Sequence, residues 1–504
     1  MIPFRPHLHS RSCSNTDSHG QKVVPQLFPP FPSNQSQHVK MGSNSETRRL
    51  KENSKPRAGG EDRISRLPDA VLCHILSLIP TKYAVRSSIL SNRWKNIWAS
   101  VPNLDFEDRS NRCIAEKKYK CDTVGFSTFV DRVLSLRDSS IDIKKFRLHW
   151  VCSSDDFSRI DGWIQTAVQH NVVELDLLVE TDSSDDFIFE FPQCIFSCKT
   201  LVALKVYSNC ISYSPPTSGC FLNLKTLYVG AEYPDSDSVE KIFSCCPVLE
   251  DLTIMGLLGQ YEVLNYKISA PELNTLRLNL PVDVGDHDQN HSIFISCPKL
   301  ENLVIRQDIL SSYIFVNVKS LVKASFTLFF HNAENLQPNF DNRAITCLAG
   351  ISNVQCLSLS AHHFLKGHCL PAFDNLRELK LVLHDCYHWD LLTELLKRSP
   401  ILEYLVVEYE EDKECADDYD EHEYLKHVLY SEHRWSTPES VPICLISHLK
   451  TITIRGFKGY PHEKKVAKYL LENGKVLNKM TIHNGLYKEL TQKRGSTTCQ
   501  VELV

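Results

Sequence analysis

Residues 64–105 read ISRLPDAVLCHILSLIPTKYAVRSSILSNRWKNIWASVPNLD, a compact and strongly apolar segment. It lies between a polar N-terminal stretch and several hundred residues of a different, repetitive character. Pro68 suits the first turn of a helix, apolar residues follow at helical spacing, and Pro80 ends that helix. Thr81 and Ser91 are candidate N-caps for a second and a third helix. The segment therefore predicts three short helices.

Three helices this short enclose only a small core, because a chain of roughly 40 residues is marginal as an independent domain. The segment carries more large apolar side chains than such a core can hold. We therefore expect some of them to face a partner or the neighbouring domain. The simpler interpretation is a helical cap on the repeats that follow.

The order of residues in this segment resembles an F-box in the form found in plant proteins. The match has no gap and combines a proline-started helix, a second proline at fixed distance and a Ser-x-Arg-Trp sequence. The resemblance implies binding to a Skp-type adaptor and, through it, to a cullin-RING ubiquitin ligase. The residues that carry it are Leu67-Pro68-Asp69, Leu72, Ile75-Leu76, Ile79-Pro80-Thr81, Ala84-Val85, Leu90-Ser91 and Arg93-Trp94.

The composition of the 504-residue chain indicates a folded protein without a membrane span. A net charge of -5 gives no argument for a nucleic-acid partner, and 42% hydrophobic residues are usual for a folded chain. No apolar run long enough to cross a membrane is present, and the N-terminus lacks the apolar core of a secretory signal. The 19 cysteines show no disulfide framework and read as buried, reduced thiols. We expect residence in the nucleus, the cytoplasm or both.

From Ile143 onward the chain repeats an apolar residue that is followed three and five positions later by two more. Most first positions lie about 21 to 29 residues apart, which is the period of leucine-rich repeats. The last two apolar residues of a unit share one side of a short strand and point into a solenoid. The thirteen units are Ile143/Phe146/Leu148, Val172/Leu175/Leu177, Leu201/Leu204/Val206, Leu224/Leu227/Val229, Leu249/Leu252/Ile254, Leu273/Leu276/Leu278, Leu300/Leu303/Ile305, Leu321/Ala324/Phe326, Val354/Leu357/Leu359, Leu376/Leu379/Leu381, Leu402/Leu405/Val407, Leu449/Ile452/Ile454 and Leu477/Met480/Ile482.

The outward strand positions of these repeats form the predicted substrate face. They mix aromatic side chains with both signs of charge, which suits a protein ligand better than a polyanion. The alternative is a flat, solvated face with binding confined to the loops. The candidates are Lys145, Arg147, Lys205, Tyr207, Tyr228, Arg277, Arg306, Lys380 and Tyr404.

The segment VPICLISHLKTITIRGFKGYPHEKKVAKYLLENGKVLNKMTI, from Val441, predicts a strand, a turn, a helix and a second strand. It resembles the FBD domain that plant F-box proteins with leucine-rich repeats often carry. The resemblance does not supply the role of that module.

No catalytic or metal-binding motif holds up. The sequence has no phosphate loop, no G-x-S-x-G and no H-E-x-x-H. Two His/Cys groups are the best metal candidates, but their spacing does not match that of zinc sites, so we expect neither a metal nor another cofactor. They are His362, His363, His368 and Cys369, and His384, Cys386 and His388.

The predicted fold is α/β: a three-helix F-box, a leucine-rich-repeat solenoid with short parallel strands on one face, and a C-terminal FBD segment. The predicted divisions are a disordered tail (1–60), the F-box (61–107), a helical connection (108–142), the repeats (143–440), the FBD domain (441–484) and a second tail (485–504). The basic run between Arg48 and Arg57 is either a nuclear-import or anionic-surface patch or, as we favour, a solvated tail. An acidic insertion at 408–424 is either solvated or a docking loop for a basic partner.

The predicted function is that of a non-catalytic subunit which holds a protein substrate for an SCF-type cullin-RING ubiquitin ligase. One alternative is a scaffold that binds partners without delivering them for ubiquitination. Another is an enzyme or small-molecule receptor built on the repeats. The predicted adaptor-binding residues, some of which must also hold the helices together, are Leu67, Pro68, Leu72, Ile75, Leu76, Pro80, Val85, Leu90 and Trp94.

Overall fold

The computed structural model describes most of the chain from residue 64 onward. The described residues are 64, 66–108, 123–181, 189–208, 211–212, 221–231, 245–256, 265–281, 291–307, 311–328, 340–361, 370–383, 389–409, 435, 437–457, 459, 461–483 and 494–504. The predictions for the N-terminal tail and its basic run, for the two His/Cys groups and for the acidic residues 410–424 lie outside this part of the chain.

The N-terminal segment folds as the predicted small helical unit. Its elements are α1 (Asp69–Leu76), α2 (Thr81–Arg86), the 3-10 turn η1 (Ser87–Ile89), α3 (Trp94–Ile97) and the 3-10 turn η2 (Trp98–Ser100). Pro68 and Pro80 take the N-cap positions of α1 and α2, where a missing N–H costs nothing. The core of the unit consists of Leu72, Leu76, Ala84, Trp94, Ile97 and Val101.

Both predicted serine and threonine caps are wrong. Thr81 is the first residue of α2, and its hydroxyl oxygen accepts a hydrogen bond of 2.7 Å from the backbone N–H of Asp105. The third helix begins at Trp94 with Arg93 as its N-cap, beyond Ser91. The Thr81 hydroxyl therefore holds the first strand of the solenoid rather than the end of its own helix.

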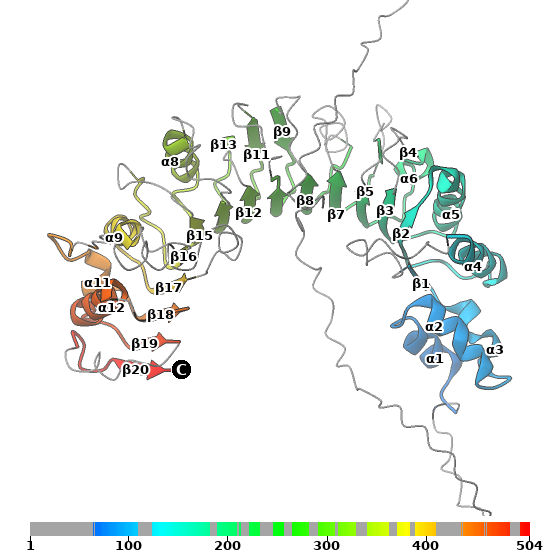
Figure 1. Ribbon diagram of the computed structural model, residues 1–504. Helices are drawn as coiled ribbons and strands as arrows, with labels where there is room; N and C mark the ends of the chain where they lie inside the picture. Colours follow the sequence, from blue (N-terminus) through cyan, green and yellow to red (C-terminus); the bar gives the residue numbers. More distant parts are fainter. Residues whose placement is uncertain are drawn as a thin grey trace, which may run out of the picture. The chain divides into compact units, whose positions relative to one another are not determined.

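The described strands of the solenoid form one parallel sheet of fifteen strands, shown side by side in Figure 1. The predicted α/β class and the parallel arrangement are confirmed. In order, the strands are β1 (Asn103–Glu107), β2 (Lys145–Cys152), β3 (Glu174–Thr181), β5 (Ala203–Ser208), β7 (Thr226–Ala231), β8 (Asp251–Gly256), β10 (Thr275–Asn279), β12 (Asn302–Gln307), β14 (Lys323–Leu328), β15 (Cys356–Ala361), β16 (Glu378–Leu383), β17 (Tyr404–Tyr409), β18 (Thr451–Arg455), β19 (Lys479–Ile482) and β20 (Gln500–Leu503).

The apolar spacing explains the sheet. In β5, Leu204 and Val206 point into the core and are at most 2% exposed, while Lys205 between them is exposed. Leu201, the first residue of that unit, is buried just before the strand begins. Each such side chain contributes about 1.5–3 kcal/mol by leaving water. Because every unit repeats this pattern, successive strands stay in register, as Leu204 does beside Leu227.

The return segments of the repeats carry helices and a second sheet. Their buried side chains belong to the same core cluster as those of the long sheet, so one core runs between the two layers. The elements are α4 (Thr123–Leu136), which contains the helix predicted before the repeats, η4 (Ser154–Asp156), α5 (Phe157–Gln169), α6 (Gln193–Phe196), α8 (Phe340–Gly350), α9 (Trp389–Arg398), and the three-stranded sheet of β9 (Asn265–Ser269), β11 (Ser292–Ser296) and β13 (Ser312–Val316). The short strands β4 (Phe189–Glu190) and β6 (Ile211–Ser212) pair with each other.

The C-terminal segment continues the same sheet. Helices α11 (Ile443–Ser447) and α12 (Pro461–Asn473) alternate with β18 and β19, and β18 pairs in parallel with β17. The predicted tail after residue 484 is wrong for its last residues, because Gln500–Leu503 forms β20 beside β19. Cys499, next to that strand, is buried and anchors the segment.

The described cysteines are free thiols, as predicted, and most of them are buried. Burial raises the pKa of the Cys444 thiol to about 12, so it stays protonated. Among the described residues, no helix is long and apolar enough to cross a membrane.

Candidate functional site

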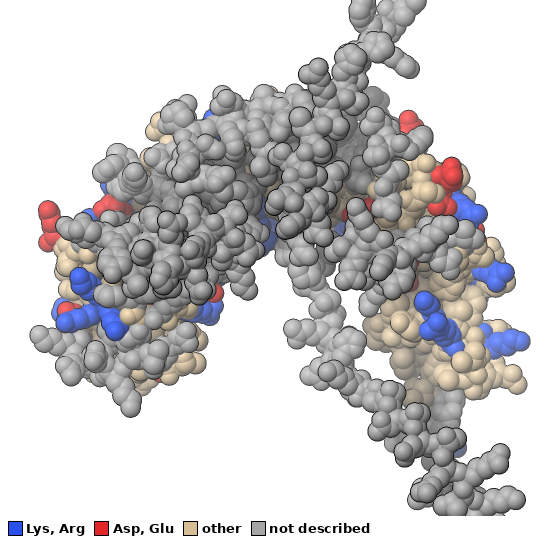
Figure 2. All heavy atoms as spheres, viewed as in Figure 1, with Lys and Arg blue, Asp and Glu red and all other residues tan. Residues whose placement is uncertain are grey.

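The F-box helices expose a group of large apolar side chains. Leu78, Ile89 and Leu90 are 72%, 85% and 67% exposed, and Tyr83 is 55% exposed. Figure 2 shows this part of the molecule as largely uncharged, with only scattered Lys and Arg side chains. Isolated apolar residues are common on protein surfaces, but several large ones exposed on so small a unit favour an interaction surface.

The predicted adaptor-binding residues separate into three groups. Leu72, Leu76 and Trp94 are buried in the helical core, so they shape the surface without forming it. Leu67, Pro80 and Val85 are half-buried, and Val85 packs against the core of the solenoid. The three exposed members, which are free to contact a partner, are Pro68, Ile75 and Leu90.

Sequence reasoning omitted several residues of this surface. Helix α1 carries apolar residues on more than one side, so its spacing alone does not reveal which side faces the core. The structure shows that Leu72 and Leu76 take the buried side and leave Val71 and Ile75 outside, 41% and 39% exposed. The omitted exposed residues are Ile64, Val71, Leu78, Ile79, Tyr83 and Ile89.

An arginine holds the two ends of the F-box motif together. The Arg93 guanidinium donates a hydrogen bond of 2.8 Å to the Asp69 carboxylate and another to the backbone carbonyl of Leu67. The Leu-Pro-Asp and Ser-x-Arg-Trp sequences are therefore in contact although they lie 24 residues apart. This contact joins the start of the first helix to the segment just before the third helix.

The second candidate surface is the outward face of the long parallel sheet. The register aligns one outward residue per strand in a row across it. Of the predicted substrate-face residues, Lys205, Arg277, Arg306 and Tyr404 are exposed, and Lys145, Arg147, Tyr207, Tyr228 and Lys380 are half-buried. Along the sheet this face divides into three zones: an ionic zone, an aromatic zone and a zone that holds a depression.

The ionic zone covers β1 to β3 and is centred on Arg147. Its guanidinium lies 2.8 Å from Asp105, 3.3 Å from Glu107 and 3.9 Å from Asp176. Burial by itself would lower the pKa of Arg147, but these carboxylates outweigh it and raise that pKa above its usual value. Burial also opposes ionisation of Asp176, but a hydrogen bond from His149 and nearby positive charges lower the pKa of that carboxyl. Arg147 therefore holds the first strands together.

The aromatic zone covers β5 to β8. The Tyr207 ring lies over Gly230, where a Cβ atom would stand 2.3 Å from the ring carbon Cδ2. The Tyr228 hydroxyl donates to the sulfur of Met255 on the next strand. Burial, with a smaller contribution from Asp176, raises the pKa of Tyr228 to about 12, so the phenol is neutral at physiological pH. This zone presents aromatic and thioether groups, which adapt well to apolar partners.

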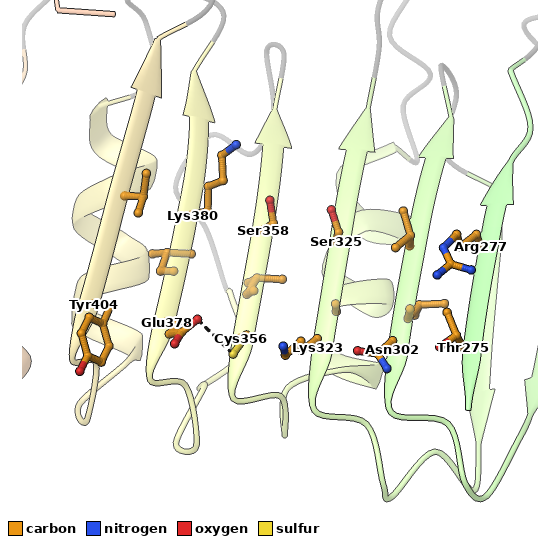
Figure 3. A pocket seen from close by; sticks show the side chains of 16 residues that line it. Thr275, Arg277, Asn302, Lys323, Ser325, Cys356, Ser358, Glu378, Lys380 and Tyr404 are labelled. Atoms are coloured by element: carbon orange, nitrogen blue, oxygen red, sulfur yellow. Dashed lines mark hydrogen bonds between the residues drawn. The ribbon is translucent and has the colours of Figure 1, made fainter. Parts of the chain in front are cut away.

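The hollowed zone covers β10 to β17 and holds a depression of about 590 Å³ (Figure 3). Short side chains of the central strands line its middle, among them Val304, Ser325 and Ser358. Arg277 lies at one end, and Tyr404 lies at the other end, next to the strand that carries Lys380. The short side chains of Val304, Ser325 and Ser358 leave room for a segment of another molecule that crosses the strands.

The charged groups around the hollow differ in their pairing. Arg277 lies 2.6 Å from Asp251 and Lys380 lies 2.7 Å from Glu408. Lys323 has no ion pair among the described residues and projects between Asn302 and Cys356. The Cys356 thiol donates to Glu378 at 3.4 Å; burial first, and then that carboxylate, raises the pKa of the thiol. Hydrogen-bond donors, one unpaired cation and a neutral thiol suit binding rather than nucleophilic chemistry.

No group of His, Cys, Asp and Glu side chains in the described part of the chain is arranged to hold a metal ion.

Comparison with known families assigns the three parts of the chain. The F-box domain family matches residues 64–106, the family described as "FBD-associated F-box protein At5g56370, LRR repeats" matches residues 160–324, and the FBD family matches residues 437–482. The matched FBD residues are those that extend the long sheet through β18 and β19.

Three similar proteins of Arabidopsis thaliana match across most of the chain. F-box/FBD/LRR-repeat protein At5g22660 is 29% identical over 89% of this chain and 98% of its own length. FBD-associated F-box protein At5g22730 is 29% identical over 88% of this chain and 94% of its own. F-box/FBD/LRR-repeat protein At4g00160 is 30% identical over 84% of this chain and 86% of its own. With its F-box helices, its repeats and its FBD strands in this order, the chain belongs to the F-box/FBD/LRR-repeat protein family.

Proposed function

We propose that this protein is the substrate-recognition subunit of an SCF-type cullin-RING ubiquitin ligase, acting in the nucleus, the cytoplasm or both. Its F-box binds a Skp-type adaptor, and the outward face of its long sheet binds a protein substrate. The protein itself performs no chemical step. It raises the local concentration of the substrate beside a ligase that other subunits complete.

The exposed apolar surface of the F-box carries the proposal. Leu72, Leu76 and Trp94 satisfy the small core, yet Ile89 and Leu90 stay largely exposed. Folding of this chain does not explain such exposure, whereas burial against a partner does, at about 25 cal/mol per Å² of apolar area.

The sheet supplies the second half of the proposal. Its aromatic zone and its hollow lie side by side on one continuous face, from β5 to β17. A substrate segment that crosses strands at about 4.8 Å per strand meets Tyr207 and Tyr228 first and the short side chain of Ser325 afterwards. The family match for the repeats, residues 160–324, covers the aromatic zone and the first strands of the hollow.

The adaptor half is tested by titrating the purified full-length chain with a purified Skp-type adaptor. The variant Ile75→Glu/Leu90→Glu places two charges on the exposed surface and leaves the buried core intact. We expect its affinity for the adaptor to fall at least a hundredfold while its melting temperature stays within a few degrees. The control Leu222→Glu alters an exposed leucine outside the F-box, 54% exposed, and should bind normally. Undiminished binding by the double variant would overturn the proposal.

The substrate half is separated from a scaffold role by following the proteins that co-purify with the chain. Cells expressing the wild type or the F-box variant are compared with and without proteasome inhibition. A substrate accumulates on inhibition and also with the F-box variant, which holds it without delivering it. If all partners keep constant levels under both conditions, the chain is a scaffold.

A further inference from the structure

An apolar surface on the FBD strands and helices has no role in the proposed function. Three branched residues form it: Ile443 and Ile446 on α11 are 63% and 48% exposed, and Val476 before β19 is 37% exposed. Ile443 and Ile446 are three apart and so share one side of their helix. We call these three residues the FBD patch.

Backbone contacts bring the three residues together. The N–H of Lys475 donates a hydrogen bond of 2.9 Å to the carbonyl of Leu445, which places Val476 beside the last turn of α11. On the other side, the Cys444 thiol donates to the carbonyl of Leu396 at 3.3 Å. The end of α9 therefore lies against the start of α11, next to Ile443.

Two unpaired cations flank the FBD patch. Arg398, the last residue of α9, and Lys475, beside Val476, are both exposed, and neither has a carboxylate partner among the described residues. The ammonium of Lys475 contacts only the backbone carbonyl of Glu472, at 3.2 Å. Their neighbours are neutralised, since Lys397 pairs with Glu394 at 2.7 Å and Lys450 with Glu403 at 2.6 Å. Within the described part of the chain, the charge left without a partner around the patch is therefore positive.

We propose that the FBD patch is a docking surface for an acidic, apolar segment of a partner protein. The apolar residues of the partner cover Ile443, Ile446 and Val476, and its carboxylates pair with Arg398 and Lys475. Such pairs steer association and fix the orientation of the segment, while the apolar contact supplies most of the affinity. The surface lies outside both the F-box and the hollow, so it recruits a partner independently of adaptor and substrate.

A protein segment fits this surface better than an anionic membrane does. Helix α11 has only five residues, and the patch has no aromatic side chain, whereas helices that insert into a membrane surface are longer and carry Trp, Phe or Leu on a continuous stripe. A second copy of this chain fits less well, because symmetric contact of the patch with itself would bring Arg398 and Lys475 against like charges.

The test uses random 12-residue peptides displayed on phage and selected against the full-length protein. Enriched peptides are synthesised with a fluorophore and titrated by anisotropy with the wild type, Ile446→Glu, Ile443→Glu and the control Leu222→Glu. We expect a class of peptides with apolar residues next to Asp or Glu, whose affinity falls at least tenfold for both isoleucine variants and is unchanged for the control. Adaptor binding should be normal in all of them.

A charge exchange makes the test specific. Lys475→Glu should weaken the same peptides about fivefold or more, and a peptide with its acidic residue changed to Lys should regain affinity for that variant alone. The proposal is overturned if no enriched peptide depends on Ile446, or if the dependent peptides lack acidic residues. It is equally overturned if vesicles containing phosphatidylserine sediment the protein, or if the protein dimerises in the analytical ultracentrifuge, in a manner that Ile446→Glu abolishes.

Discussion

The hydroxyl oxygen of Thr81 accepts the backbone N–H of Asp105 at 2.7 Å, and Asp105 in turn accepts the guanidinium of Arg147 at 2.8 Å. Helix α2 of the F-box is thereby connected through β1 to β2 by two consecutive hydrogen bonds. Strand β1 belongs to both units, since it follows the F-box directly and is the first strand of the long sheet. The orientation of the F-box on the solenoid therefore depends on side chains within the F-box motif itself.

Replacing Thr81 with Val should loosen this connection. Valine has the shape of threonine but leaves the Asp105 N–H without an acceptor, at a cost of about 1–3 kcal/mol. Hydrogen exchange followed by mass spectrometry should show faster exchange in β1, with α12 unaffected. Thr81→Ser keeps the hydroxyl and serves as the control; equal exchange in the Val and Ser variants would contradict the role assigned to the hydroxyl.

Two alanine variants should distinguish residues of the F-box core from residues of its binding surface: Leu72→Ala and Leu90→Ala. Leu72 is fully buried, so its truncation should destabilise the helical unit by about 2–5 kcal/mol. Leu90 is 67% exposed, and its truncation should leave folding unchanged while weakening adaptor binding. Limited proteolysis reports the first effect and titration with the adaptor the second. Equal protease sensitivity of the two variants would contradict the division.

Arg147→Met should destabilise the first repeats. It removes the cation shared by Asp105, Glu107 and Asp176 and leaves three partly buried carboxylates together, which we expect to cost roughly 2–3 kcal/mol. Urea denaturation followed by tryptophan fluorescence, to which the buried Trp150 on β2 contributes, measures the loss. Arg306→Met, which removes an exposed arginine of β12 several strands away, is the matched control and should change stability little.

Asp176 should make the same region sensitive to acid. Its pKa is lower in the folded protein than in the unfolded chain, so the carboxylate stabilises the fold above the unfolded pKa of about 3.9, and this contribution is lost as the pH falls through the folded value. The stability difference between the wild type and Asp176→Asn should be largest above about pH 4 and shrink below it. A difference independent of pH between 3 and 6 would contradict this assignment.

Gly230→Ala should displace the Tyr207 ring from the sheet. The added Cβ would stand 2.3 Å from ring carbon Cδ2, so the ring must move, and we expect a loss of about 1–3 kcal/mol. In a Tyr207→Ala background the same substitution should cost little, which a double-mutant cycle measures. Additive effects would show that the ring and the glycine do not interact.

The repeating fold could be predicted because the buried apolar residues recur at the same spacing in each unit. Strands β1 and β20 were missed for different reasons. Val101, Leu104 and Phe106 have the spacing of a repeat unit, but on sequence alone they were assigned to the F-box. At β20 the first position of the triplet is the polar Thr498, so the repeat pattern is incomplete there, and pairing with β19 decides the structure.

The candidate sites were less predictable than the fold. The F-box motif named the right helices, but Leu72 and Ile75 look alike in sequence and differ only in which side of α1 meets Trp94 and Ile97. On the sheet, Arg147 and Arg277 occupy equivalent positions. The carboxylates that bind Arg147 come from the two flanking strands, β1 and β3, so only the assembled sheet distinguishes the two arginines.

Because the FBD strands pair edge to edge with β17, the FBD is a terminal cap as well as a module. Deleting it would leave the N–H and C=O groups of β17 unpaired along an apolar strand that contains Leu405 and Val407, and such an edge invites aggregation. A truncated protein would therefore disappear from cells through misfolding, whatever the FBD binds. Roles of the FBD are better read from surface substitutions such as Ile446→Glu than from truncation.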